Sequence, residues 1–139
     1  MAYKRKTWAE KLNSPATHKV EITDMKFADI PEGAKMLVAT PKIVVEYVKN
    51  IPEGSSSTLQ QMRQDLAREY GAEYSCPITS GIFLRIVTEH AYEELQKGRL
   101  EDEVAPFWRI IDSKAPAAKK LTFGMDFLKE QRRKEGLKQ

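Results

Sequence analysis

The residue best suited to covalent chemistry is Cys76, the only cysteine of the chain. It precedes Pro77, where we expect a helix to begin, and the dipole at a helix N-terminus favours a thiolate. A nucleophilic cysteine also needs a base, but no histidine is close in sequence and His90 follows more than about three helical turns later. Because free cysteines are often small buried hydrophobes, we interpret Cys76 as structural.

Other reactive side chains do not fall into catalytic or metal-binding patterns. His18 and His90 lack the spacing of zinc ligands, so we expect no structural metal. The acidic run Glu101 to Glu103 indicates a solvated loop rather than a carboxylate pair for acid–base catalysis. The sequence predicts no cofactor.

The charge of the chain permits contact with nucleic acid without requiring it. Its 139 residues carry 23 Lys and Arg against 20 Asp and Glu, a formal charge of +3. Cations open the chain at Lys4 to Lys6 and crowd its last quarter, so one end could carry a positive surface. No apolar run approaches the ~20 residues that cross a bilayer, and the start lacks the apolar core of a secretory signal. We therefore expect a cytoplasmic protein with no membrane partner.

Three helices are expected in the middle of the chain. The first spans about Thr40 to Asn50, with a threonine cap followed by proline. Thr58 and Gln61 form a capping box for the second, which ends at Gly71. The third begins at Pro77 and continues beyond Leu95.

The third helix is expected to present the DNA-contacting surface. One half of its helical wheel holds large apolar residues and should face the core: Ile78, Ile82, Phe83, Ile86 and Val87. The other half holds small or hydroxyl-bearing residues, an exposed leucine and one guanidinium: Ser80, Gly81, Leu84, Arg85 and Thr88. This pattern, after a helix and a short turn, indicates a helix-turn-helix. The candidate DNA-binding residues are Thr79, Ser80, Gly81, Arg85 and, in a later loop, Lys114.

Two explanations stay open for Gly81, which costs about 1 kcal/mol of helix propensity relative to alanine. A partner could approach the backbone closely there, or two helices of the chain could cross tightly.

The remaining segments complete a mainly α fold with a small β wing, a winged helix-turn-helix. Residues 1–35 should form a partly ordered arm with a short helix around Trp8 to Leu12, and residues 36–139 the winged-helix domain. We expect a strand or turn over Val104 to Ile111, a return strand over Leu121 to Gly124, and a last helix over Asp126 to Lys134.

Four segments together resemble the C-terminal DNA-binding domain of methylated-DNA–protein-cysteine methyltransferases: Ile51 to Gly54, Cys76 to Phe83, Pro106 to Ile111, and Gly124 to Gly136. The resemblance spans about residues 36 to 136 and is closest to the alkyltransferase-like group, which lacks the acceptor cysteine. The Pro-x-x-Arg-(Val/Ile)-Ile element and its distance to the closing Glu-Gly are moderately specific.

The resemblance implies that the chain binds duplex DNA from the minor-groove side and turns an alkylated guanine into a pocket beside a Pro-Cys-His-Arg motif. Here Phe107 stands at the cysteine position and Trp108 at the histidine position, and only Arg109 remains. The nucleophile and its activating base are both replaced, so we expect no alkyl transfer and no enzyme. These three are the candidate lesion-pocket residues. The Phe107 ring could stack on an extruded base, or both aromatics could fill the core.

The chain also departs from the family at other positions. Alkyltransferase-like relatives usually carry tryptophan at the cysteine position and keep the histidine. The arginine that the family inserts into the duplex falls on Gly81, and an early tyrosine of the motif falls on Leu59. In the closing helix, Gln131 and Arg132 stand where relatives often have two leucines. These changes weaken base flipping, whereas general DNA affinity could survive.

Three functions remain open. The leading hypothesis is a non-catalytic protein that binds duplex DNA, recognises alkylated guanine and marks it for another repair protein. The second is a winged-helix transcriptional regulator without lesion preference, and the terminal cations favour these two. The third is a protein-interaction adaptor, favoured by the exposure expected for Leu84.

Overall fold

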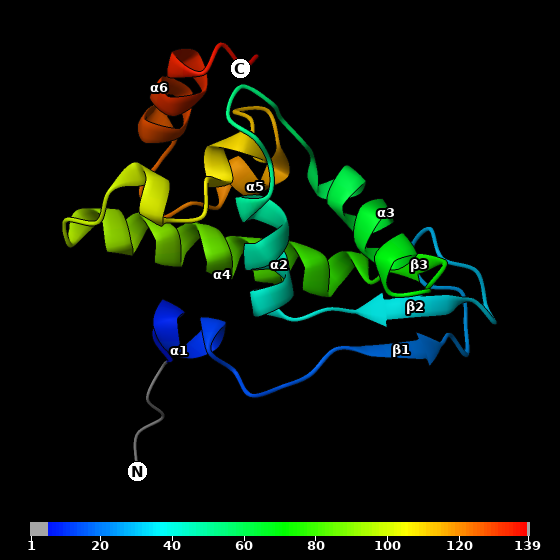
Figure 1. Ribbon diagram of the computed structural model, residues 1–139. Coiled ribbons are helices and arrows are strands. Elements are labelled where there is room, and N and C mark those ends of the chain that lie inside the picture. The colour runs from blue at the N-terminus through cyan, green and yellow to red at the C-terminus, as the bar shows by residue number, and fades with distance from the viewer. Residues whose placement is uncertain (1–5, 139) are drawn as a thin grey trace.

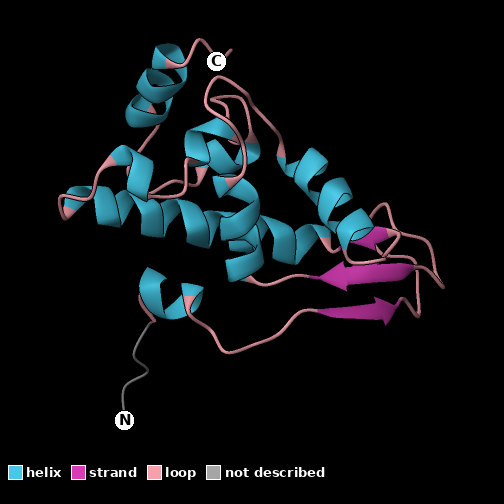
Figure 2. Ribbon diagram, in the orientation of Figure 1, coloured by secondary structure: helices cyan, strands magenta, loops and turns pink. Residues whose placement is uncertain are grey.

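Residues 6–138 are described by the structure, a computed structural model, and they form a mainly helical chain with one small sheet (Figures 1 and 2). The helices are α1 (Trp8–Leu12), α2 (Pro41–Lys49), α3 (Leu59–Glu69), α4 (Pro77–Gln96), α5 (Pro116–Lys119) and α6 (Asp126–Lys134). The strands are β1 (Lys19–Ile22), β2 (Lys35–Val38) and β3 (Tyr74–Ser75), and two 3-10 turns are η1 (Glu101–Glu103) and η2 (Phe107–Arg109). The predicted helical class with a small sheet is confirmed at this level.

Local signals in the sequence set the ends of α2 and α3. Thr40 Oγ1 accepts a hydrogen bond from the backbone N–H of Ile43, and Thr58 Oγ1 accepts one from Gln61, which satisfies donors at each helix start. The reciprocal half of the predicted capping box is absent, because the Gln61 side chain donates to Asp65 instead. Gly71 follows α3 with φ of +71°, a conformation that glycine adopts without a Cβ clash.

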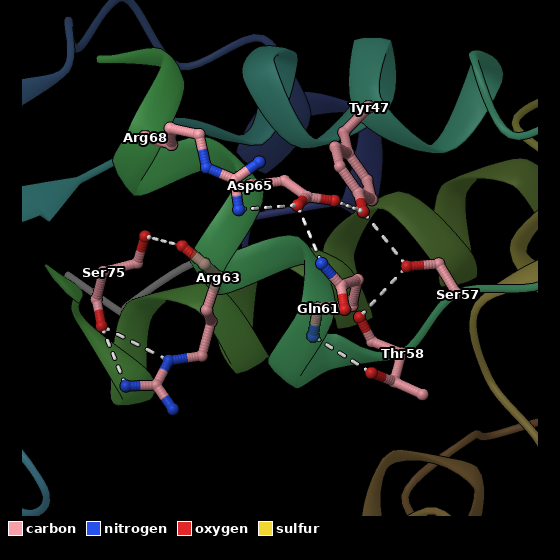
Figure 3. A network of polar contacts seen from close by, with 8 residues as sticks. All are labelled: Tyr47, Ser57, Thr58, Gln61, Arg63, Asp65, Arg68 and Ser75. Carbon is pink, nitrogen blue, oxygen red and sulfur yellow. Dashed lines mark hydrogen bonds and ion pairs between the residues drawn. The ribbon is translucent and has the colours of Figure 1, made fainter. Parts of the chain in front are cut away.

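The sheet joins distant parts of the chain. Its order is β1-β2-β3, with β1 antiparallel to β2 and β2 parallel to β3. The register places Val20 opposite Leu37, and Leu37 is fully buried. Between α3 and β3, Arg63 donates from Nε and Nη2 to the carbonyl of Ser75, while Ser75 Oγ donates to the carbonyl of Arg63 (Figure 3). These bonds fix the connection between α3 and α4.

The small sheet does not lie where the sequence predicted it. No strand forms at Leu121 to Gly124, where a return strand was expected, and Val104 to Ile111 contains η2 and therefore takes the turn alternative. Strand pairing needs a partner of matching register, and β2 supplies one to both β1 and β3. No local pattern reveals such pairing between distant segments.

The core gathers around α4, which runs through the middle of the molecule (Figure 1). Helices α1, α2 and α3 and the turn η2 all pack against it. The largest fully buried side chains come from α3, α4, α6, η2 and β2 and from two loops: Phe107, Ile30, Leu37, Met62, Leu84, Ile111 and Leu128.

The N-terminal region is packed on the rest of the chain as far as it is described. The helix predicted at Trp8 to Leu12 is present as α1, and it contacts α4 and α2. Strand β1 lies within the stretch that was expected to be an extended arm. Of the three cations that open the chain, Lys4 and Arg5 lie outside the described residues.

None of the helices within residues 6–138 combines the length and the apolar character needed to cross a membrane.

Candidate nucleic-acid interface

The sequence predicted the faces of α4 only in part, since Ile86 and Val87 are buried as expected but other residues are placed differently. Ser80, Leu84 and Thr88 are 3%, 1% and 0% exposed, whereas Ile78 and Ile82 are 57% and 51% exposed. The expected exposure of Ser80 and Leu84 is therefore wrong. Small side chains allow neighbouring elements to approach a central helix closely, so Ser80 and Thr88 lie inside while two isoleucines remain outside. The candidate DNA-binding residue Ser80 cannot reach a ligand from this position.

Gly81 is half-buried and precedes the exposed Ile82 on α4. A Cβ atom built at Gly81 would meet only Leu59 Cδ2, at 4.0 Å, which is an ordinary van der Waals distance. Packing within the described chain therefore does not require glycine at this position, so a tight helix crossing does not explain it. Thr79, one turn from Phe83, is half-buried, and its Oγ1 is shielded from solvent without a hydrogen-bond partner among the described residues.

Arg85 is held by contacts inside the chain. Its guanidinium lies 5.4 Å from the centre of the Trp8 ring, within the range of a cation–π contact. Its Nε is 3.8 Å from Glu89 Oε2, and the side chain is 40% exposed. Arg85 therefore keeps part of its surface for a ligand, but its direction is fixed by α1 and by Glu89.

Glu89 connects α4 to a basic loop. Its side chain is 2% exposed and accepts hydrogen bonds from the backbone N–H of Thr122 at 2.9 Å and from Thr122 Oγ1 at 2.6 Å. The segment before Thr122 carries three exposed lysines that form no ion pair with the described residues: Lys114, Lys119 and Lys120. The Glu89–Thr122 contact holds this segment against the middle of α4, next to the turn that carries Arg85.

Phe107 and Trp108 are buried in an aromatic cluster. They are 0% and 2% exposed, and their ring centres lie 5.2 Å apart in an edge-to-face arrangement. Phe123 and Phe127 lie 5.7 and 5.9 Å from Phe107, and Tyr92 stacks on Phe123 at 3.8 Å. A base could stack on Phe107 only if one of these rings moved. Of the two alternatives for this pair, the structure places both rings in the core.

Arg109 contacts the chain itself rather than an open pocket. Its Nε donates to Glu135 Oε1 at 2.9 Å and its Nη1 donates to the carbonyl of Ile51, also at 2.9 Å. The side chain is 16% exposed. The arginine thus joins η2 to the loop after α2 and to the end of α6.

Glu135 is the acceptor at the centre of this network. Besides Arg109, it accepts hydrogen bonds from Trp108 Nε1 at 2.6 Å and from the backbone N–H of Gly54 at 3.0 Å. Burial raises the pKa of the carboxyl group, but the hydrogen bonds from Arg109, Gly54 and Trp108 outweigh it, so the pKa lies below the ordinary value of 4.5. Glu135 brings together three of the segments that carry the family resemblance.

Two buried polar residues of α6 also have partners. Gln131 Nε2 donates to Glu101 Oε1, and Arg132 Nη1 donates to the carbonyl of Trp108 at 2.7 Å. Both residues are 4% exposed. Burial lowers the pKa of the Arg132 guanidinium, although Asp112 and Glu135 oppose this effect. These two departures from the family pattern are satisfied structural contacts.

A second polar network joins α2 to α3 (Figure 3). Tyr47 Oη donates to Asp65 Oδ2 at 2.6 Å and lies 3.0 Å from Ser57 Oγ. These residues line a groove of about 840 Å³ whose rim also carries Glu46 and Glu69. Its three carboxylates make this groove unsuited to a phosphate backbone. Sequence reasoning missed both the contacts of Tyr47 and the Glu89–Thr122 contact, because these bonds join residues 10, 18 and 33 positions apart and share no local pattern.

The only thiol is inaccessible. Cys76 is 7% exposed and occupies the N-cap position of α4. Within residues 6–138, no group of three or more His, Cys, Asp or Glu side chains could hold a metal ion.

Comparison of the chain with protein-family models, with curated proteins and with solved structures found no match. The resemblance to the alkyltransferase domain therefore stays a hypothesis that rests on the four sequence segments.

Proposed function

We propose that the chain is a non-catalytic protein that binds duplex DNA from the minor-groove side, with α3, the connection through β3, and α4 as a helix-turn-helix. The observation that carries this proposal is Gly81. It lowers helix propensity in the second helix of the pair, yet the described chain leaves room for a Cβ there, with Leu59 at an ordinary contact distance. Close approach by an outside partner accounts for the glycine.

The side chains around Gly81 suit a minor-groove surface. Ile78 and Ile82 are more than half exposed and lie one turn apart on α4. Minor-groove proteins often insert apolar side chains between base steps, while cations contact the phosphates. Lys119, the last residue of α5, and Lys120, which follows it, supply such cations from the segment that Glu89 holds beside α4.

Alkyl transfer and lesion recognition by stacking are both disfavoured. The alkyltransferase route needs a thiolate and a base, and Phe107 and Trp108 supply neither. Because both rings are buried among other aromatics, we expect similar affinity for duplexes with and without an alkylated guanine. The biological role would then be closer to a DNA-associated regulator than to a lesion sensor.

Fluorescence anisotropy with labelled duplexes, with and without one alkylated guanine and at two salt concentrations, tests the proposal. We expect equal affinity for both duplexes and a steep loss with salt, since counterions are released from phosphates. Replacing Lys119 and Lys120 by Gln should reduce the salt slope by about 1 to 2. The matched control replaces Lys42 and Lys49 by Gln, which removes the same charge from α2, and should bind normally.

Gly81→Ala separates a binding role from a structural one. Alanine should raise the stability of the fold by up to about 1 kcal/mol, because its methyl group would meet Leu59 without a clash and its helix propensity is higher. The same change should weaken DNA binding. A less stable variant with normal binding would contradict the role given to Gly81.

The adaptor alternative keeps one supporting observation. Its original support, an exposed Leu84, is lost because Leu84 is buried, but Ile78 and Ile82 offer a different exposed apolar surface on α4. Absence of binding to every duplex at low salt would favour this alternative. Mass spectrometry after incubation with methylated DNA should show no added methyl group, and methylation of Cys76 would overturn the non-catalytic assignment.

A further inference from the structure

β1 is an edge strand of the sheet. β2 occupies one side of β1, and within the described chain no other strand pairs with it. The backbone N–H of Thr23 donates to Ala34 and its carbonyl accepts from Gly33, so Thr23 faces β2. Because the bonding direction alternates along an antiparallel strand, the backbone N–H and C=O groups of Val20 and Ile22 point away from β2. They present a template for another strand.

This edge carries exposed apolar side chains beside its charged ones. Every residue of β1 is exposed, and Val20, Ile22 and Met25 are three of the six large hydrophobic side chains that are exposed in the described chain. Soluble proteins usually protect an exposed edge by keeping it short, by charges such as lysine, or by proline, a bulge or an inward-pointing charge. β1 is short and carries Lys19 and Glu21, but it contains no proline and no bulge. Its charges oppose pairing in most registers, so an added strand must offer complementary charges.

The charges of β1 favour a partner strand with a complementary charge pattern. Lys19 and Glu21 lie on one face of the strand, where they form an ion pair, and Val20 and Ile22 lie on the other. We propose that two copies of the chain associate edge to edge through β1, antiparallel, with Val20 opposite Val20 of the second copy. In this register each Lys19 faces a Glu21 of the other copy at a non-hydrogen-bonded pair, where side chains are closest.

The neighbouring symmetric registers are less favourable. Centring the pair on Glu21 would place two glutamates opposite each other, which is destabilising. Centring it on Ile22 would place Glu21 opposite Thr23, without an opposite charge. The sequence Lys-Val-Glu-Ile is therefore self-complementary in one register only. This association depends on β1 alone and is independent of DNA binding.

The dimer should be weak. Pairing of about five residues buries much less than the roughly 1,200 Å² of a standard stable interface. We therefore expect a concentration-dependent equilibrium rather than a permanent dimer. In sedimentation velocity over the micromolar to millimolar range, the average mass should rise from 15.9 kDa toward twice that value.

Charge exchange tests the register. Lys19→Glu and Glu21→Lys each place like charges opposite each other, and each should weaken association at least about tenfold. The double variant Lys19→Glu/Glu21→Lys restores opposite charges and should dimerise again. An equimolar mixture of the two single variants should form heterodimers, because one then carries two glutamates and the other two lysines. Lys42→Glu, the same charge change on α2, is the control and should dimerise like the unaltered chain.

Val20→Pro tests the backbone part of the interface. Proline removes only an N–H that points away from β2, so the variant should keep its circular dichroism spectrum and lose association. A chain that stays monomeric at millimolar concentration would overturn this inference. Dimers that are insensitive both to the charge exchanges and to Val20→Pro would also overturn it, because another surface would then be responsible.

Discussion

At the scale of single residues, the side chains that the sequence suggested for a lesion pocket act together as a structural joint. Glu135 accepts hydrogen bonds from Trp108, Arg109 and Gly54, and Arg109 continues to the carbonyl of Ile51. These bonds tie η2 to α6 and to the loop after α2. A buried carboxylate with three donors is stabilising only while it is ionised.

Glu135→Gln should destabilise the fold in a pH-dependent way. The pKa of Glu135 is depressed in the folded chain, so its contribution is present above the ordinary value of 4.5 and is lost as pH falls through the folded value. We expect a loss of about 1–3 kcal/mol at pH 7, measured by urea unfolding. The difference from the unaltered chain should shrink at lower pH. Glu69→Gln, at an exposed carboxylate of α3, is the control and should cost little at any pH. A loss in Glu135→Gln that does not change with pH would contradict this assignment.

The sequence shows the chemical groups that Trp108 and Arg109 carry, but not what these residues contact. Their partner Glu135 lies 26 residues beyond Arg109, and Thr122 lies 33 beyond Glu89. Contacts over such separations depend on the folded arrangement, so no spacing rule predicts them.

At the scale of elements, helix ends were predictable, and the faces of α4 were predictable only in part. Caps and prolines placed α2, α3 and α4 within a residue or two, because a capping bond involves only near neighbours. The burial of Ile86 and Val87 was predicted correctly, but Ile78 and Ile82 are exposed and Leu84 is buried, against the prediction. α4 is surrounded by α1, α2, α3 and η2, so apolar residues occur around much of its circumference and a single stripe does not identify the core side.

The packing of α2 on α3 gives an element-scale prediction. Burial, together with the hydrogen bond donated to Asp65, raises the pKa of Tyr47 to about 12. Its stabilising effect is therefore complete below the ordinary value of 10 and is lost as pH rises from 10 through the folded value. Tyr47→Phe should lower stability by about 1 kcal/mol at pH 7 and flatten this alkaline loss.

Unfolding titrations between neutral pH and pH 12, with phenolate absorbance as a second signal, measure both effects of Tyr47→Phe. Tyr74→Phe is the control, since Tyr74 lies in β3 and is not a member of this network. A normal alkaline titration of Tyr47 would contradict the bond to Asp65.

At the scale of the whole molecule, the N-terminal region contributes more to the fold than its sequence indicated. Composition suggested a partly ordered arm over residues 1–35, because it has few periodic apolar residues. In the structure, β1 pairs with β2, Trp8 lies under Arg85, and Ile30 is fully buried. The pairing of β1 with β2 and the contact of Trp8 with Arg85 both join residues that are far apart in sequence, which explains why the local pattern was weak.

A chain that begins at residue 36 should therefore be less stable. It loses Ile30, whose removal from the core is comparable to a large-to-small substitution costing about 2–5 kcal/mol, and it also loses α1 and β1. For a chain of this size the loss of Ile30 alone corresponds to a fall in Tm of roughly 5–15 °C, and the loss of α1 and β1 should lower Tm further. Ile30→Ala in the full chain separates the two contributions, since the truncated chain should melt well below this variant. Equal melting of the truncated and full chains would mean that residues 36–139 carry the whole stability, and that α1 and β1 serve binding rather than folding.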